Sequence, residues 1–254
     1  MIDTAYARAR AAALGFSGMG AIPAAPALTL PAYERWIEAG MHAGMGYMAR
    51  PDRLARRRDL SLILPGVRTL MLVTCDYGTA IPPALLEDPA RGRIAAYAWG
   101  ADYHPLMTER LSALAADVVA AAGGACKVYV DTGALLERAH AAEAGLGFIG
   151  KNTMLIHPRR GSRFFLGVLL TDAPCDSYST PAPLPGCGTC TRCLTACPTD
   201  AFPAPHVLDA RRCISYWTIE HKGAIDPALR DRFGNWVYGC DVCQEVCPWN
   251  RFAP

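Results

Sequence analysis

The stretch CGTCTRCLTACP, residues 187–198, decides how the C-terminal part of this chain folds. Its cysteines follow the spacing C-x2-C-x2-C-x3-C, and a proline comes directly after the last of them. Three thiolates at two-residue gaps can surround one iron–sulfur cube, whereas the fourth ligates a second cluster in two-cluster proteins. The run therefore predicts a bacterial ferredoxin-like fold built around clusters, whose chemistry is electron transfer.

A shorter run of the same kind, C-x2-C-x3-C-P, begins at residue 240, and one further cysteine lies upstream of it at residue 213. Counting ligands with the fourth cysteine of each run exchanged gives two complete sets. The first set is Cys187, Cys190, Cys193 and Cys247, and the second is Cys197, Cys213, Cys240 and Cys243. Residues 214–239 then form an insertion between ligands of the second set.

Zinc is the alternative occupant, because C-x2-C pairs also bind it. Zinc sites usually take four ligands from two separated pairs, a pattern that these two runs fit poorly. We therefore expect two 4Fe–4S clusters, with zinc or a damaged ferredoxin-like fold as the alternative. Cys75, Cys126 and Cys175 lie outside the pattern and are expected to be small buried residues.

The bulk composition indicates a globular protein of one large or two ordinary domains. The 254 residues are 52% hydrophobic with a net charge of +2, so bulk charge does not indicate a nucleic-acid binder. The N-terminus MIDTAYARARAAALGF has neither the form of a signal peptide nor that of a membrane span. We expect a cytoplasmic monomer without membrane association, in a compartment where disulfides are rare.

Hydrophobic patterning predicts an α/β or α+β domain before the cysteine runs. Helices are expected over residues 3–14, 31–40, 105–124 and 135–145, and strands over 69–77, 126–132, 153–158 and 164–172. The segment SYSTPAPLPG, residues 177–186, is typical of a linker. The predicted domains are therefore 1–176 and 177–254.

Several polar residues of the first domain have two interpretations. Asp131 follows a predicted strand and precedes a helix, so it either caps that helix or acts as a general acid. The turn GLGFIGKN, residues 145–152, is either a simple tight turn or a close approach of backbone to a large ligand. His104 and His157 are as compatible with ordinary surface positions as with a site. No G-x-G-x-x-G follows a strand, so a Rossmann site is not supported.

Taken together, four long stretches resemble the epoxyqueuosine reductase family. They are YVDTGALLERAHAAEAGLGFIGKNTMLIHPRRGSRFFLG (129–167), CGTCTRCLTACPTDAF (187–202), RRCISYWTIEHKG (211–223) and YGCDVCQEVCPWN (238–250). The resemblance implies a cobalamin-binding domain related to reductive dehalogenases, followed by the two-cluster domain. It implies reduction of epoxyqueuosine to queuosine at the wobble position of tRNA, the last step of queuosine biosynthesis. An external low-potential donor would supply the electrons, which pass through the clusters to cobalamin.

The resemblance also assigns residues. Asp131 matches the proposed proton donor, and burial against the corrin and protein is expected to raise its pKa. The expected cobalamin contacts are Arg53, Tyr103, Lys151, Asn152, Thr153, Leu155, His157, Glu220, His221 and Lys222. Cobalt is expected without a histidine ligand from the protein.

The tRNA contact is the less specific part of this prediction. RPDRLARRR, residues 50–58, holds five arginines that either contact phosphate or form a solvated face, and Tyr216 or Trp217 either stacks on a base or packs in the core. Many family members continue past the second cluster into helical repeats, whereas this chain ends seven residues after Cys247. The alternative functions are a dehalogenase-like reductase of a small molecule and an electron carrier.

Overall fold

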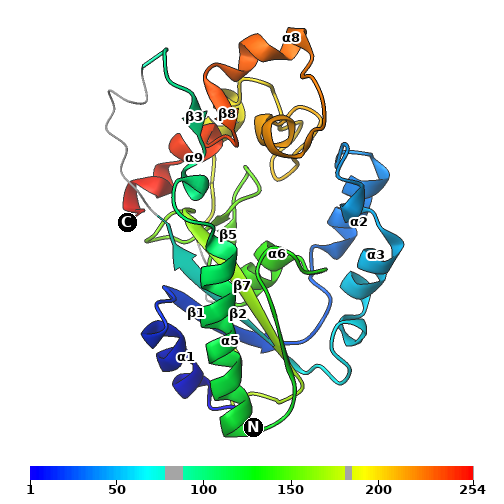
Figure 1. Ribbon diagram of the computed structural model, residues 1–254, viewed down its shortest axis with the longest axis vertical. Coiled ribbons are helices and arrows are strands. Elements are labelled where there is room, and N and C mark those ends of the chain that lie inside the picture. Colours follow the sequence, from blue (N-terminus) through cyan, green and yellow to red (C-terminus); the bar gives the residue numbers. More distant parts are fainter. Residues whose placement is uncertain (78–87, 181–184, 254) are drawn as a thin grey trace.

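A four-stranded antiparallel sheet forms the centre of the first domain in this computed structural model (Figure 1). The structure describes residues 1–77, 88–180 and 185–253. The strand order is β1-β2-β7-β4, with β1 at Gly18–Pro23, β2 at Thr69–Asp76, β7 at Phe164–Thr171 and β4 at Cys126–Tyr129. Because all three pairings are antiparallel, the α+β alternative holds and α/β does not.

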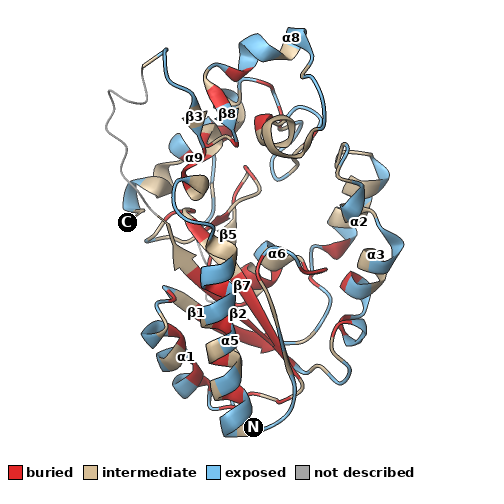
Figure 2. Cartoon of the chain, viewed as in Figure 1, coloured by how far each residue is buried: buried red, intermediate tan, exposed pale blue. Residues whose placement is uncertain are grey.

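Both faces of this sheet are buried, as Figure 2 shows for its central strands. Along β2, Met71 and Val73 pack into a core that includes α1 (Thr4–Ala13) and α5 (Tyr103–Ala122). Leu70 and Leu72 point to the opposite face, which is covered by α6 (Glu137–Glu143) and the loops near it. The period of two along a strand therefore explains why TLMLV is apolar without interruption.

The edge strand β1 was missed by the sequence prediction because its sequence, GMGAIP, has few residues that favour strands. Close packing explains the glycine at position 20, because a Cβ there would lie 2.5 Å from the carbonyl oxygen of Ala144, at the end of α6. The helix α2 (Leu30–Glu38) is confirmed, whereas α3 (Pro51–Arg58) was not predicted. Its proline at the first helical position and its following arginines suit a helix whose exposed face is polar.

A short hairpin connects the sheet domain to the cysteine-rich unit. Its strands β5 (Phe148–Ile149) and β6 (Leu155–Ile156) flank a turn at residues 150–154. The predicted strand over 153–158 is thus reduced to two residues, because Thr153 has a φ of +63° and residues 157–161 turn again. The predicted strand over 126–132 likewise stops early, at Tyr129.

The C-terminal unit contains short elements. They are α7 (Arg192–Ala196), the π-helical turn η4 (Tyr216–Glu220), α8 (Pro227–Arg230), η5 (Asp231–Phe233), β8 (Trp236–Tyr238), α9 (Val242–Glu245) and η6 (Pro248–Phe252). The small core of the C-terminal unit comprises Ala95, Ile214, Phe233 and Trp236.

Three further short helices lie earlier in the chain. They are η1 (Gly46–Met48), η2 (Leu60–Leu62) and η3 (Ala96–Ala98).

One segment crosses the predicted domain boundary. Strand β3 (Arg93–Ile94) pairs in parallel with β8, and the Ala96 N–H donates to Asp241 Oδ2 at 2.6 Å. Residues 93–98 therefore pack with the C-terminal unit although they precede it by some ninety residues in sequence. The division at residue 176 remains a prediction, and residues 181–184 of the expected linker lie outside the described residues.

A buried polar cluster fixes the two units against each other. Ser162 Oγ donates to Gln244 Oε1 at 2.9 Å, and the Ser162 N–H donates to Asn250 Oδ1 at 2.6 Å. A Cβ at Gly161, whose φ is +67°, would lie 2.1 Å from Asn250 Oδ1, so only glycine allows this close approach. No helix within the described ranges has the length and apolar character needed to span a membrane.

The core of the sheet yields a stability prediction. Leu169 on β7 is fully buried, so Leu169→Ala should lower the free energy of unfolding by about 2–5 kcal/mol through lost burial and an internal cavity. Leu28→Ala is the control because that side chain is 82% exposed, and it should change little. Urea unfolding followed by circular dichroism measures both, and equal effects of the two changes would contradict this description of the core.

Candidate functional site

The first predicted set of cysteines lies together in the C-terminal unit. Burial raises the pKa of the Cys193 thiol, and the neighbouring Cys187 and Cys247 raise it further. Burial also raises the pKa of Cys247, which interacts with Cys187 and Cys190. Cys187, Cys190, Cys193 and Cys247 line one small cavity, with Trp249 at its wall. The four residues therefore surround a common space.

The second predicted set is brought together in the same way. Burial raises the pKa of Cys240 to about 12, with contributions from Cys213 and Cys197. The pKa of Cys243 is raised strongly by burial, then by Cys240 and Cys213. Cys193 of the first set also acts on Cys243, so the two sets are neighbours.

The thiols of each cysteine set can ionise together only if positive charge lies between them. Four thiolates in one buried set repel one another, and burial further disfavours each charge. Within the described residues, no three histidine, cysteine or acidic side chains come close enough to hold a single metal ion. The cysteine spacing in the two runs suits a polynuclear iron–sulfur cluster better than zinc.

The turn after β5 joins the cysteine sets to the sheet domain. The Lys151 N–H donates to Cys187 Sγ at 3.4 Å, and Lys151 Nζ donates to the carbonyl oxygens of Gly188 and Cys190 at 2.7 and 3.0 Å. Asn152, which is 3% exposed, donates from Nδ2 to the Cys243 carbonyl at 3.1 Å. This turn thus contacts one loop of each cysteine set.

Asp131 lies in a tight turn beyond β4 with a φ of +59°, a conformation rare outside glycine. It does not cap the next helix, since the N-cap of α6 is Leu136 and that helix has no side-chain cap. Its carboxylate accepts from Tyr103 Oη at 3.2 Å, and His104 Nε2 lies 3.8 Å from the same oxygen. The side chain is 68% exposed, so the protein alone does not supply the expected burial.

Aromatic stacking positions the donor to Asp131. The Tyr103 ring lies between those of His104 and Phe165, with centroid separations of 4.1 and 3.9 Å. Burial and then the Asp131 charge raise the pKa of Tyr103, so its hydroxyl keeps its proton. Asp102 is the N-cap of α5 and lies 2.7 Å from His104 Nδ1. The WGADYHP stretch is therefore both a helix start and part of this site.

Glu137 and Arg138 form the inner wall beside Asp131. Glu137 Oε1 accepts from the Asp131 N–H at 3.1 Å, and Arg138 Nη1 donates to the Thr153 carbonyl at 2.9 Å. Burial, followed by the negative charge of Asp131, raises the pKa of Glu137 to about 8. Burial also lowers the pKa of Arg138, although solvent still reaches that side chain. Glu137 and Arg138 thus line a partly exposed region beside Asp131, which is named the Asp131 recess below.

Two segments distant in sequence close the outer side of this recess. Arg53 Nη1 on α3 donates to the carbonyl of Thr132 at 3.4 Å, and Tyr47 Oη donates to Glu220 Oε1 at 3.1 Å. Burial and then Glu220 raise the pKa of Tyr47 to about 12. The insertion between cysteine ligands therefore reaches the first domain beside the Asp131 turn.

Other predicted contacts are placed differently. Leu155 is 2% exposed and its side chain packs in the core beneath α6, so that side chain is not available to a ligand. His157 makes its hydrogen bonds within its own turn, with Arg159 and Gly161. His221 Nε2 lies 3.3 Å from the Ala224 carbonyl, and Lys222 is exposed.

Three residues of the site were not singled out from the sequence. Glu137 and Arg138 belong to the YVDTGALLER stretch, six and seven residues after Asp131, but their inward direction depends on where α6 begins. Tyr47 lies in a Gly- and Met-rich loop without a motif, so its contact with Glu220 could not be inferred.

Comparison with known proteins agrees with this geometry. Residues 186–250 match the family model described as a 4Fe-4S double cluster binding domain, and residues 57–132 match "Epoxyqueuosine reductase QueG, DUF1730". The chain is 45% identical over 256 residues to epoxyqueuosine reductase of Gloeobacter violaceus, covering 98% of this chain and 76% of that protein. This chain belongs to the epoxyqueuosine reductase family.

Other epoxyqueuosine reductases match at similar levels. The Pseudomonas aeruginosa relative is 45% identical over 223 residues, covering 87% of this chain and 61% of that relative. The chain thus spans about three fifths of that relative's length. The Streptococcus thermophilus epoxyqueuosine reductase structure has a TM-score of 0.87 at 32% identity, covering 99% of this chain and 67% of that one.

Two further structures place the fold more widely. An epoxyqueuosine reductase structure with an epoxyqueuosine-modified tRNA-Tyr stem loop has a TM-score of 0.87 at 33% identity, covering 98% of this chain and 65% of that one. The reductive dehalogenase NpRdhA has a TM-score of 0.61 at 17% identity, covering 96% of this chain and 31% of that one, and shares the fold. The expected relation to dehalogenases is confirmed at the level of the fold.

The buried carboxyl of Glu137 gives a pH-dependent prediction. Its folded pKa of about 8 exceeds the ordinary 4.5, so the folded chain retains a proton that the unfolded chain releases. The contribution of this carboxyl to the free energy of unfolding is fully present below pH 4.5, the ordinary pKa, and is lost as the pH rises toward about 8. Glu137→Gln replaces the ionisable carboxyl by an amide that does not titrate, and the amide oxygen can still accept from the Asp131 N–H.

The stability of Glu137→Gln relative to wild type should therefore increase between about pH 5.5 and about pH 8.5. Urea unfolding of both proteins across this range measures the difference. Glu109→Gln, at an exposed position of α5, serves as the control. A wild-type to Glu137→Gln difference that stays constant with pH would show that this carboxyl is ionised throughout.

Proposed function

We propose that this chain reduces epoxyqueuosine to queuosine at the wobble position of tRNA, using two 4Fe–4S clusters and cobalamin. The observation that carries the proposal is membership of the epoxyqueuosine reductase family along 98% of the chain, together with an acidic residue beside two neighbouring cysteine sets. A small-molecule dehalogenase activity is less supported, since those neighbours share only 17% identity.

The eight cysteines are proposed as the cluster ligands in the two sets described above. The charges of Cys243 and Arg138 interact, which supports an order for electron flow because Arg138 adjoins the Asp131 recess. The second set is then the one nearer to the site of reaction. The first set, which contains Cys247, lies further out.

The recess beside Asp131 has the chemical character that a large, amide-decorated cofactor needs. Hydroxyl, carboxylate and guanidinium groups of Tyr103, Glu220 and Arg53 surround it, so both donors and acceptors are available. We propose that these residues, with the 151–153 turn and residues 221–222, hold cobalamin, which supplies a strongly reducing cobalt when bound. Leu155 supports the hairpin from the core.

Asp131 is proposed to protonate the oxygen that leaves the epoxide. Removing that oxygen as water takes two electrons and two protons, so a positioned acid is required. The protein holds the Asp131 carboxyl through Tyr103 and its backbone through Glu137. Since the side chain is open to solvent in the chain itself, bound ligands must supply the desolvation that keeps it protonated.

The tRNA anticodon loop is the proposed partner, as a related reductase was solved with a modified stem loop. The arginine run of residues 50–58 contributes less free charge than its composition indicated. Arg57 is buried over Tyr33, and Arg58 pairs with Glu34 at 2.6 Å. Arg53 and the exposed Lys222 remain the proposed phosphate contacts, while Trp217 packs against the C-terminal core.

Asp131→Asn tests the acid. The amide keeps the shape but cannot donate a carboxyl proton, so turnover should fall by about 10²- to 10⁴-fold. Visible spectra of bound cobalamin and affinity for an epoxyqueuosine stem-loop should stay near wild type. Asp3→Asn, at the N-cap of α1 and outside the site, is the control and should retain most activity. Wild-type turnover in Asp131→Asn would remove it from this role.

Cys213→Ala tests the exchanged ligand sets. Loss of one second-set ligand should reduce iron from about eight to about four atoms per chain, since each set holds one 4Fe–4S cluster. Cys175→Ala removes a buried cysteine of the sheet core and should retain all of the iron. Iron and sulfide analysis after anaerobic reconstitution measures this. Full iron content in Cys213→Ala would disprove the assignment.

A further inference from the structure

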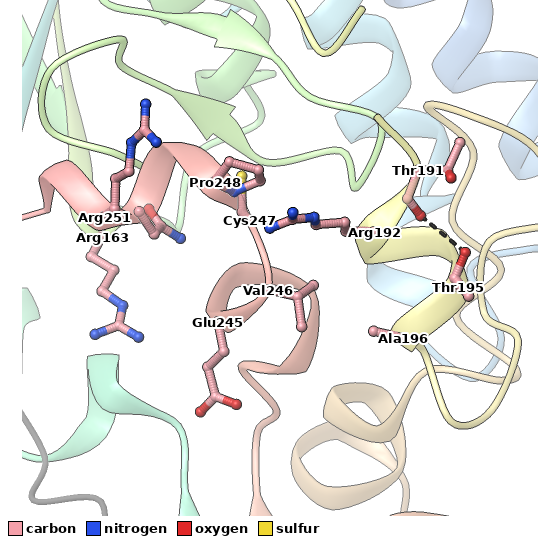
Figure 3. A pocket seen from close by; sticks show the side chains of 11 residues that line it. Arg163, Thr191, Arg192, Thr195, Ala196, Glu245, Val246, Cys247, Pro248 and Arg251 are labelled. Atoms are coloured by element: carbon pink, nitrogen blue, oxygen red, sulfur yellow. Dashed lines mark hydrogen bonds between the residues drawn. The ribbon is translucent and has the colours of Figure 1, made fainter. Parts of the chain in front are cut away.

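An open depression of about 820 Å³ lies on the C-terminal unit (Figure 3), and its lining includes none of the residues described around Asp131. Its lining comes from α7, α9, η6 and the chain just before β7. Among the lining residues are Cys247, a member of the first cysteine set, and three arginines, Arg163, Arg192 and Arg251. The depression thus brings a proposed cluster ligand next to clustered positive charge.

The positive charge here is local. The whole chain carries a net charge of only +2, yet three arginines line this one depression. The acidic residue of the lining, Glu245, forms an ion pair with Arg93 and also faces Arg163, so the local positive charge is carried by Arg192 and Arg251. Arg192 and Arg251 are exposed, and Figure 3 shows them on either side of Cys247.

The depression also lies at the outer end of the electron path. Cys247 belongs with Cys187 and Cys190, whereas Cys243 of the second set acts on Arg138 beside Asp131. The charge of Cys193 acts on Cys243, so the two sets are neighbours. An electron entering beside Cys247 would therefore pass through the first set and then the second before reaching the recess.

We propose that this depression is the docking site for an acidic electron-carrier protein, which reduces the first cluster beside Cys247. This inference rests on the cluster ligands proposed above. In each encounter the carrier is oxidised by one electron and the cluster is reduced by one electron, with no bond made or broken. Two such encounters supply the electrons that one epoxide requires.

Charge complementarity favours an acidic protein as the occupant. Arginines around a depression attract an acidic surface and speed its encounter, an effect that falls as salt is added. A small reductant gains little from such a docking surface. The tRNA, also anionic, is expected at the Asp131 recess, which is lined by different residues and adjoins the other cysteine set.

The test is anaerobic stopped-flow reduction of the reconstituted clusters, without RNA, by reduced flavodoxin as the acidic carrier. The double variant Arg192→Glu/Arg251→Glu should slow this reduction by about tenfold or more at low salt, and the wild-type rate should itself fall with salt. Reduction by dithionite should remain unchanged. Arg68→Glu, at the opposite end of β2 from the cysteine sets, carries the same charge change per site and should have little effect.

Arg192 adjoins the ligand Cys193, so Arg251→Glu and Thr195→Glu are also made as single variants at exposed side chains. Iron content is measured for each, because Thr195 lies two residues from Cys193 and from Cys197. Each should slow flavodoxin without changing iron content. Rates equal to wild type in both single variants, or an equal loss in Arg68→Glu, would overturn the docking site. Loss of stem-loop affinity with an unchanged flavodoxin rate would instead assign this surface to RNA. Because the readout is cluster reduction, failure of tRNA turnover leaves this test intact.

Discussion

The structure depends on holding two sets of four cysteine thiols at the junction of two units. Burial and mutual proximity raise the pKa values of Cys193, Cys240, Cys243 and Cys247, so these groups are unfavourable as a cluster of bare thiolates. Positive iron at their centres relieves that cost. Because Cys197 and Cys247 each belong to the set built around the other run, neither set is complete without the other.

That exchange determines how the rest of the chain is arranged. The second proposed set includes Cys213, and the residues between Cys213 and Cys240 extend to the sheet domain, where Glu220 meets Tyr47. The turn at Lys151 and Asn152 binds one loop of each set, and Thr153 of the same turn binds Arg138. The two cysteine sets and the Asp131 recess are therefore joined by the short β5–β6 hairpin.

The sequence predicted the parts that depend on local spacing. The cysteine runs allowed both ligand sets to be proposed, and the apolar run TLMLVTCDY correctly indicated a buried strand. The α+β alternative could be chosen only from the structure, because strand order and direction depend on long-range pairing. Strand β1 was missed because its glycines are explained by distant packing, such as the approach of Ala144 to Gly20 from 124 residues away.

The candidate site was predicted in the same uneven way. Asp131 was placed at the site, but its exposure was not anticipated, since it depends on a turn with positive φ. Leu155 adjoins residues of the turn in sequence but faces the core, because side chains alternate along a strand. Tyr47, Glu137 and the crossing segment at residues 93–98 meet their partners through tertiary packing that no motif records.

The most direct test is anaerobic reaction of the chain, loaded with both clusters and cobalamin and fully reduced, with a saturating anticodon stem-loop that bears epoxyqueuosine. Nucleoside mass spectrometry measures the product while absorbance follows the clusters. We predict queuosine formation accompanied by oxidation of the clusters, at two electrons per product. Clusters that remain reduced, with epoxyqueuosine unchanged on bound RNA, would contradict the account.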